Sequence, residues 1–333
     1  MNEKITLAHG AGGQLSQELM KEVILPVFDN PILNLLHDGA IINLNNPKIA
    51  FTTDSYVIRP IFFNGGNIGK LSICGTINDL AMSGAVPKFI SVAFIIEEGF
   101  LIEDLKCIVK SMRKTADEAG ITIVTGDTKV VNHGQCDGIF INTAGIGQLI
   151  DNVNISPKSV KSGMKIIVSG MIGDHAAAIL SERHNLNLNL ESDCAPLNEL
   201  VNQMLEVAPD IAMLRDPTRG GLAAVLNEIA QSSDVGIIID EDSLPIREQV
   251  HGVCDILGFD VLELANEGKL VAFVHENEAE KVLEVMHKNK YGINAAIIGE
   301  VVNSAKGQVG LKTSIGSIRI VDMPMGNLVP RIC

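Results

Sequence analysis

The stretch Leu214-Arg215-Asp216-Pro217-Thr218-Arg219-Gly220-Gly221 is one of the two most specific patterns inside this chain. It precedes a segment with helical periodicity, whose apolar residues are expected to face inward: Leu222, Val225, Leu226 and Ile229. An acid, two arginines and a glycine pair before the amino end of a helix are typical of a site for phosphate and a metal ion. Proline at position 217 is compatible with this, because proline is tolerated near a helix start.

The other specific pattern is Ala265-Asn266-Glu267-Gly268-Lys269, which lies between an apolar segment and a predicted strand at 270–274. Predicted strands and helices alternate around both patterns. A helix is predicted over 101–119 with Gly120 as its stop, and a strand follows at 121–125. The two halves of the chain alternate in a similar way, which favours an α/β fold built from two units.

Domain boundaries are predicted from length and from local composition. A chain of 333 residues is long enough for about two domains. Between positions 150 and 163 the sequence turns polar, and we expect the boundary there. We therefore predict domains at 1–150 and 151–321. The last residues, 322–333, show neither helical nor strand periodicity and contain two prolines, so we expect a mobile tail.

Composition excludes several classes of protein. A hydrophobic fraction of 46% with 20% charged residues describes a globular chain. The net charge of −14 argues against nucleic acid or an anionic membrane as a partner. No apolar run approaches the length of a membrane span. The six cysteines are scattered without a Cys-x-x-Cys pair, which argues against zinc or an iron–sulfur cluster and favours a reduced, cytoplasmic protein.

Four carboxylates stand at predicted strand ends, among small residues or before glycines: Asp54, Asp79, Asp127 and Asp216. An acidic chain that binds ATP through such residues needs Mg²⁺ between acid and phosphate. The sequence contains no P-loop, no kinase glycine loop and no Rossmann fingerprint. Any ATP site is therefore of another kind.

Two further segments carry weaker signals. The glycines of His9-Gly10-Ala11-Gly12-Gly13 precede a helical pattern and would let backbone amides approach a phosphate, or form an ordinary loop. In Gly173-Asp174-His175, the acid is suited to cap a helix, and the histidine is either a packing residue or a catalyst.

The chain ends on Cys333, at the end of the predicted tail. Twelve extended residues give a reach of roughly 40 Å. Arg331 favours the thiolate while the terminal carboxylate opposes it, so local charge alone does not decide whether Cys333 is reactive. The tail is thus either an ordinary chain end or a carrier arm.

These patterns together resemble the HypE family of hydrogenase maturation proteins. That family belongs to the PurM-like ATP-binding superfamily, with aminoimidazole ribonucleotide synthetase, selenophosphate synthetase and thiamine-monophosphate kinase. The resemblance runs over essentially the whole chain, through the segments at 9–13, 53–56, 75–79, 126–129, 173–175, 215–221, 265–269 and 330–333. The terminal Pro330-Arg331-Ile332-Cys333 selects this family over its relatives. Selenophosphate synthetases place a reactive residue near the amino terminus, whereas the first cysteine here is Cys74.

The resemblance implies a function, a fold and partners. A HypF-like carbamoyltransferase would load a carbamoyl group onto Cys333, and the chain would dehydrate it to a thiocyanate with ATP. The cyanide would then pass to a HypC–HypD-like complex for the iron of [NiFe]-hydrogenase. The implied fold has two domains, with an amino-terminal sheet that pairs with its twin in a homodimer.

The resemblance also implies roles for residues. We expect the metal ligands to be Asp54, Asp79, Asp127 and Asp216. We expect the nucleotide to be bound by Gly12, Gly13, Asp54, Asn78, Asp79, Thr128, Arg219 and Gly220. We expect catalysis by Cys333, Glu267, Lys129 and His175, with Lys129 stabilising phosphate charge and Glu267 acting as the base or as a further metal ligand.

Two alternatives remain at the level of sequence. A small-molecule kinase or synthetase of the same superfamily would not need the tail. A non-catalytic ATP-binding assembly factor would use the tail only as a docking peptide.

Overall fold

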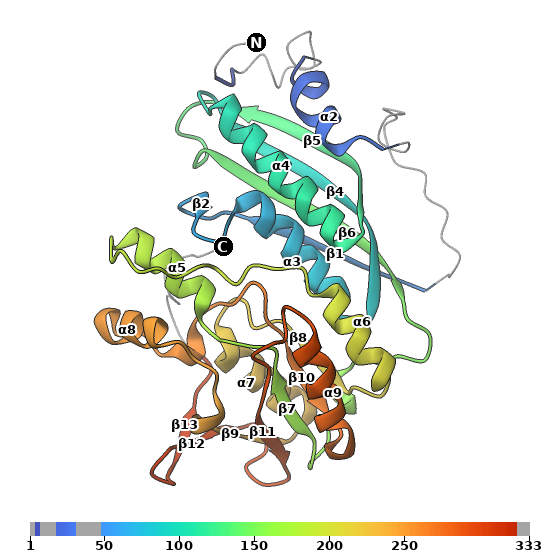
Figure 1. Ribbon diagram of the computed structural model, residues 1–333, viewed down its shortest axis with the longest axis vertical. Helices are drawn as coiled ribbons and strands as arrows, with labels where there is room; N and C mark the ends of the chain where they lie inside the picture. Colours follow the sequence, from blue (N-terminus) through green and yellow to red (C-terminus); the bar gives the residue numbers. More distant parts are fainter. Residues whose placement is uncertain (1–3, 7–17, 31–47, 325–333) are drawn as a thin grey trace.

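The computed structural model describes residues 4–6, 18–30 and 48–324. The two halves of the described chain each contain a β-sheet and its covering helices, as Figure 1 shows. This arrangement confirms the predicted α/β class. No helix in these three ranges is long and apolar enough to cross a membrane.

The first half is built on a four-stranded sheet in the order β1-β6-β4-β5. The strands β4 and β5 run parallel, whereas β6 runs antiparallel to both of its neighbours. The elements of this half are η2 (Met20–Ile24), α2 (Leu25–Phe28), β1 (Ile49–Tyr56), β2 (Phe62–Phe63), β3 (Gly66–Asn67), α3 (Ile68–Met82), β4 (Ala85–Glu97), α4 (Ile102–Ala119), β5 (Thr122–Val131) and β6 (Ile139–Leu149).

The helices α3 and α4 cover one face of this sheet (Figure 1). The predicted apolar stripe of α4 is buried, at Leu105, Ile108 and Met112. Gly120 ends the helix in the left-handed conformation with φ 69°, as its position predicted. The helix α3 is buried almost all round, because the sheet, α4 and the second half of the chain surround it.

The second half is built on a seven-stranded sheet in the order β13-β12-β9-β11-β7-β10-β8. Its elements are β7 (Lys165–Val168), α5 (Asp174–Arg183), α6 (Asn198–Val207), β8 (Met213–Arg215), α7 (Gly221–Ser233), β9 (Gly236–Asp240), α8 (Glu248–Leu257), β10 (Val271–Val274), α9 (Glu276–Lys288), β11 (Ala296–Val302), β12 (Val309–Lys312) and β13 (Ile318–Val321). Short 3₁₀ turns lie at 157–159, 241–243 and 261–263.

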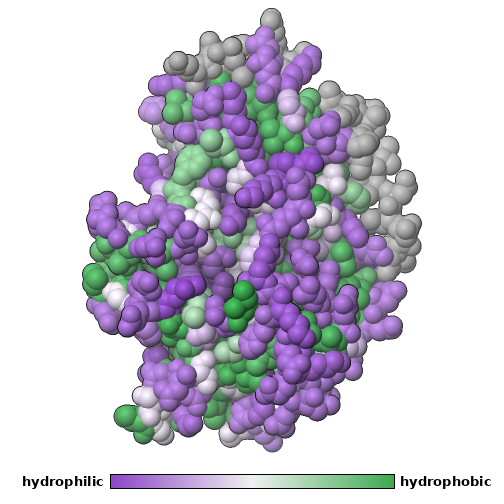
Figure 2. All heavy atoms as spheres, viewed as in Figure 1, coloured by the Kyte–Doolittle hydropathy of each residue, from purple (hydrophilic) through white to green (hydrophobic). Residues whose placement is uncertain are grey.

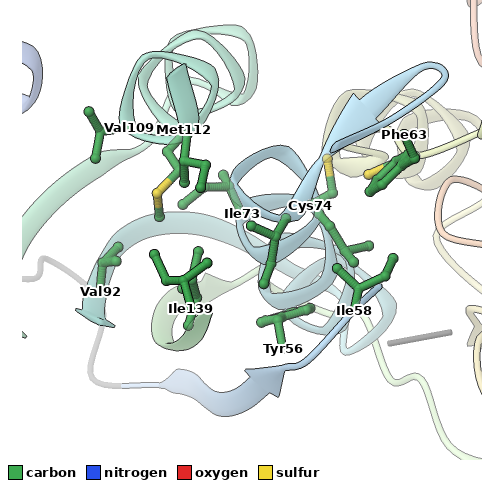
Figure 3. Packing of buried hydrophobic residues seen from close by; sticks show 14 of the residues in the cluster. Tyr56, Ile58, Phe63, Ile73, Cys74, Val92, Val109, Met112 and Ile139 are labelled. Carbon is green, nitrogen blue, oxygen red and sulfur yellow. The ribbon is translucent and has the colours of Figure 1, made fainter. Parts of the chain in front are cut away.

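The two halves meet through α3. The helix α6 and strand β8 of the second half both contact it. On its other side, α3 packs into the core of the first half, where Ile73 and Cys74 belong to the same buried cluster as Tyr56 of β1 (Figure 3). Residues of α3 are therefore placed to serve a site formed by both halves.

Candidate active site

A cavity of about 800 Å³ is lined by residues of both halves. Its walls come from β1 and α3 on one side, and from β8, the loop before α7 and the loop at 265–269 on the other. The cavity brings together five of the residues predicted from sequence: Asp54, Asp79, Asp216, Arg219 and Glu267. The first and last of these residues, Asp54 and Glu267, are more than two hundred positions apart in the chain. The packing of α3 between the halves brings them to one cavity.

Two of the carboxylates come from the first half. Thr52 donates a hydrogen bond of 2.8 Å to Oδ2 of Asp79, and the hydroxyl of Tyr56 donates one of 3.3 Å to Oδ2 of Asp54. Burial raises the pKa of Asp54, although the hydrogen bond from Tyr56 and the charge of Arg219 oppose the rise. Burial also raises the pKa of Asp79, with the charge of Asp54 adding to it. Both carboxylates are thus suited to meet a cation.

The third carboxylate, Asp216, lies between β8 and α7. Burial raises its pKa to about 7, and the negative charge of Asp79 contributes further. The helix α7 begins five residues later, so its amino end lies beside the cavity, where Thr218 and Arg219 form part of the wall. A helix amino end with an arginine provides donors for phosphate oxygens.

Glu267 closes the cavity from the second half. The residue is 4% exposed, and its own backbone N–H donates to Oδ1 of Asp193 at 3.0 Å. The cavity thus has acidic groups from β1, α3 and two loops of the second half, and it is bordered by one helix amino end. This arrangement suits a metal ion held between carboxylates and phosphate oxygens.

Comparisons with known proteins agree over both halves. Residues 36–149 match the AIR synthase related protein N-terminal domain, and residues 161–312 match the corresponding C-terminal domain. The chain is 47% identical to carbamoyl dehydratase HypE of Rhodobacter capsulatus, covering 100% of this chain and 99% of the relative. It is 48% identical to carbamoyl dehydratase HypE of Escherichia coli strain K12, covering 99% of each.

The chain belongs to the carbamoyl dehydratase HypE family. This confirms the resemblance expected from the motifs.

Solved structures of HypE proteins are similar along nearly the whole chain. A crystal structure of hydrogenase maturation protein HypE in complex with ATP superposes with a TM-score of 0.95 at 45% identity, covering 98% of this chain and 99% of that one. A crystal structure of a HypE–HypF complex gives a TM-score of 0.81 at 50% identity, covering 92% and 99%. A thiamine-monophosphate kinase from Stenotrophomonas maltophilia, at 18% identity and a TM-score of 0.67, shows the shared fold alone.

Three predicted residues of this HypE family member lie elsewhere, on β5. We expected Asp127, Thr128 and Lys129 to follow a strand, but β5 continues through them to Val131, because it keeps pairing with β4 beyond the irregularity at Ile90 and Ser91. Strand β5 lies at the opposite edge of the sheet from β1. Neither Asp127 nor Lys129 lines the cavity of its own chain.

The face on which Asp127 lies follows from the strand register. Asp127 pairs with Ala93, Ala93 with Asn142, and Asn142 with Ser55. Residues directly opposite one another share a face of the sheet, so this row lies on the same face as Ser55. Its neighbour Asp54 lies on the other face, toward α3. Asp127 is exposed there.

Asn78 and His175 are buried and do not line the cavity. The side chain of Asn78 bonds to backbone: it accepts from Leu197 N–H at 2.8 Å and donates to Ala195 O at 3.1 Å. The ring of His175 meets the Ser192 hydroxyl at 2.8 Å and packs edge-on against Phe63. Burial lowers the pKa of His175 to about 4. These positions favour a structural role for Asn78 over the expected contact with the nucleotide, and a structural role for His175 over the expected part in catalysis.

The remaining predicted site residues are Gly220, Gly12, Gly13 and Cys333, and only Gly220 lies within the described chain. Gly220 is the buried residue before α7, in the left-handed conformation with φ 78°. Gly12, Gly13 and Cys333 lie outside the described residues. The last two described residues, Met323 and Pro324, line the cavity.

Sequence reasoning overlooked Thr52 and Tyr56, which line the cavity and bond to its carboxylates. Both stand two positions from Asp54 in a strand, where alternate residues share a face. That period of two was the signal that would have placed them beside Asp54.

Proposed function

We propose that this chain is an ATP-dependent carbamoyl dehydratase that acts on a carbamoyl group carried by its own Cys333, and converts it to a thiocyanate. The observation that carries this proposal is that Met323 and Pro324 line the acidic cavity. The nine residues from 325 to 333 have a full extension of about 30 Å. This length is sufficient for Cys333 to return to the carboxylates beside which its own arm starts.

The chemistry requires activation of a poor leaving group. Transfer of the γ-phosphate of ATP to the carbamoyl oxygen makes departure as phosphate feasible. The carbamoyl nitrogen loses one proton when the oxygen is phosphorylated and a second when phosphate leaves, so that S–C(=O)–NH₂ and ATP give S–C≡N, ADP and phosphate. Glu267 is our candidate base, because it is the acidic residue of the loop facing β1 across the cavity.

The residues of the cavity fit Mg²⁺ when ATP is also bound. Within the described ranges, no three acidic, histidine or cysteine side chains are close enough to hold a metal ion by themselves. Mg²⁺ in nucleotide sites is commonly held by one or two carboxylates together with phosphates, and it would neutralise phosphate charge here. We propose Asp54, Asp79 and Asp216 for this role, with Arg219 and the amino end of α7 binding phosphate.

A homodimer would explain the positions of Asp127, Thr128 and Lys129. The helix-covered side of the molecule is mainly hydrophilic in Figure 2. The opposite face of the four-stranded sheet instead exposes large apolar side chains: Phe51 is 66% exposed and Ile95 is 41% exposed. We propose that this face pairs with its twin. Asp127 and Lys129 of one copy would then serve the cavity of the other.

The partners follow from the family. A relative has been solved as a HypE–HypF complex. We propose that a HypF-like carbamoyltransferase loads Cys333, and that a HypC–HypD-like complex receives the cyanide. The five described cysteines form no disulfide, in keeping with the reduced, cytoplasmic setting that we propose.

Intact-protein mass spectrometry tests this function. After incubation with the carbamoyltransferase, the carboxy-terminal peptide should gain one carbamoyl group, and it should lose one water only after Mg·ATP is added. Cys333→Ser should abolish both changes. Cys107→Ser, which alters an exposed cysteine on α4, should leave both intact.

Each other outcome points to one of the alternatives. Carbamoylation without ATP-dependent loss of water would make the chain an ATP-binding assembly factor. An unmodified Cys333 would favour a kinase or synthetase acting on a free small molecule.

A further inference from the structure

Asp193 is a buried carboxylate with no part in the reaction described above. Its side chain is 2% exposed and lies in the wall of a second cavity, of about 390 Å³. Oδ1 accepts the backbone N–H of Glu267 at 3.0 Å, and Oδ2 lies 3.2 Å from Nζ of Lys269. This one carboxylate therefore contacts the two residues that flank Gly268.

The main chain at Glu267 is also held through its carbonyl oxygen. Its carbonyl oxygen accepts from the N–H of Ala195 and from the side-chain amide of Asn78, both at 3.4 Å. A Cβ at Gly268 would lie 1.8 Å from the carbonyl oxygen of Asp193, so only glycine permits this close approach. The segment 193–195 thus fixes where the main chain places the Glu267 side chain.

We propose that Asp193, with Lys269 as its counter-charge, is a positioning residue that holds Glu267 where it removes protons from the carbamoyl nitrogen. This inference rests on the proposed function. Misplacement of a reacting group by about 1 Å costs on the order of 100-fold in rate. Lys269 is needed because a buried carboxylate without a counter-charge is strongly unfavourable.

The test compares the rate of ATP-dependent water loss from the carbamoylated chain. Asp193→Ala should lower kcat roughly 10- to 100-fold and leave the KM for ATP within about twofold. Because Asp193 acts through Glu267, the double variant Asp193→Ala/Glu267→Gln should be no slower than Glu267→Gln alone.

A conservative pair and a matched control separate positioning from folding. Asp193→Asn/Lys269→Met keeps an oxygen for the Glu267 N–H and removes both charges, so it should restore kcat to within about fivefold of wild type. Asp174→Asn alters another buried carboxylate of the second cavity, paired with Arg247 at 3.0 Å, and should leave kcat unchanged.

The outcomes distinguish this inference from the function on which it rests. A wild-type chain without ATP-dependent water loss would overturn the proposed function, and the inference with it. An active wild type with a normal kcat in Asp193→Ala would overturn the inference alone. The inference alone would also be overturned if the fold-decrease in kcat of Asp193→Ala/Glu267→Gln equalled the product of the fold-decreases in the two single variants.

Discussion

At the scale of single residues, the protonation of Asp216, a proposed metal ligand, makes the free energy of unfolding depend on pH. Its pKa is raised to about 7 by burial and by Asp79, so folding favours the protonated carboxyl. Between pH 4 and 7 the native chain binds more protons than the unfolded chain, and the free energy of unfolding therefore falls as pH rises. The rise from 3.8 to about 7 is about three pKa units, so Asp216→Asn should stabilise the metal-free protein by about 4 kcal/mol at pH 8 and by only about 1 kcal/mol at pH 4.5.

Thermal unfolding of the metal-free protein at both pH values measures this effect. Asp210→Asn, which changes an exposed aspartate outside the cavity, is the control and should not shift the midpoint. Equal midpoint shifts for Asp216→Asn at pH 4.5 and pH 8 would contradict the explanation, because the gain would then not depend on ionisation.

Single residues also show how far sequence reasoning extends. Asp54, Asp79, Asp216 and Glu267 lie together, as the expected metal and phosphate site required. Asn78 stands one position before Asp79 in α3, yet its side chain forms hydrogen bonds with backbone groups and does not line the cavity. A sequence shows that a residue is polar, but it does not show which partners use its atoms after folding.

At the scale of elements, β1 is the strand that borders both the cavity and the proposed dimer interface. Its alternating pattern turns Asp54 toward α3, and Phe51 toward the exposed face of the sheet. If this face is the homodimer interface, Phe51→Lys introduces a charge that must be desolvated on association. The dimer dissociation constant should rise at least about tenfold, as measured by sedimentation velocity.

Ile256→Lys is the matched control for that substitution. Ile256 lies on α8 in the second half and is also 66% exposed, so the variant adds the same charge to a comparably exposed apolar site. It should leave the dimer intact. A monomeric wild type, or equal weakening by both variants, would refute the assignment of the sheet face.

Among the elements, α4 was predicted correctly from sequence, whereas the end of β5 was not. The helix at 101–119 was expected from its apolar period and its terminal glycine, and α4 follows both. The end of β5 was missed because Gly126-Asp127-Thr128-Lys129 has the composition of a loop. Pairing with β4 overrides this local preference and carries the strand on to Val131.

At the scale of the whole molecule, the separation of Asp127 from Asp216 predicts that activity requires two copies. Strands β5 and β1 lie three strand spacings apart, roughly 14 Å, and Asp127 faces away from α3. Asp127→Asn and Asp216→Asn should each be inactive alone. When equal amounts are unfolded and refolded together, half of the dimers should be mixed, and one site in each mixed dimer has both aspartates.

Activity of the mixture should therefore reach about a quarter of the wild-type value, because the two sites of a symmetric dimer are equivalent. ATP-dependent water loss from the carbamoylated chains measures it. Separate refolding followed by mixing on ice is the control, and it should stay inactive as long as subunits do not exchange. An inactive co-refolded mixture that sedimentation shows to be dimeric would mean that both aspartates must belong to the same copy. An Asp127→Asn variant that is active by itself would place Asp127 outside the site, and the acidic cavity of one chain would then be the complete active site.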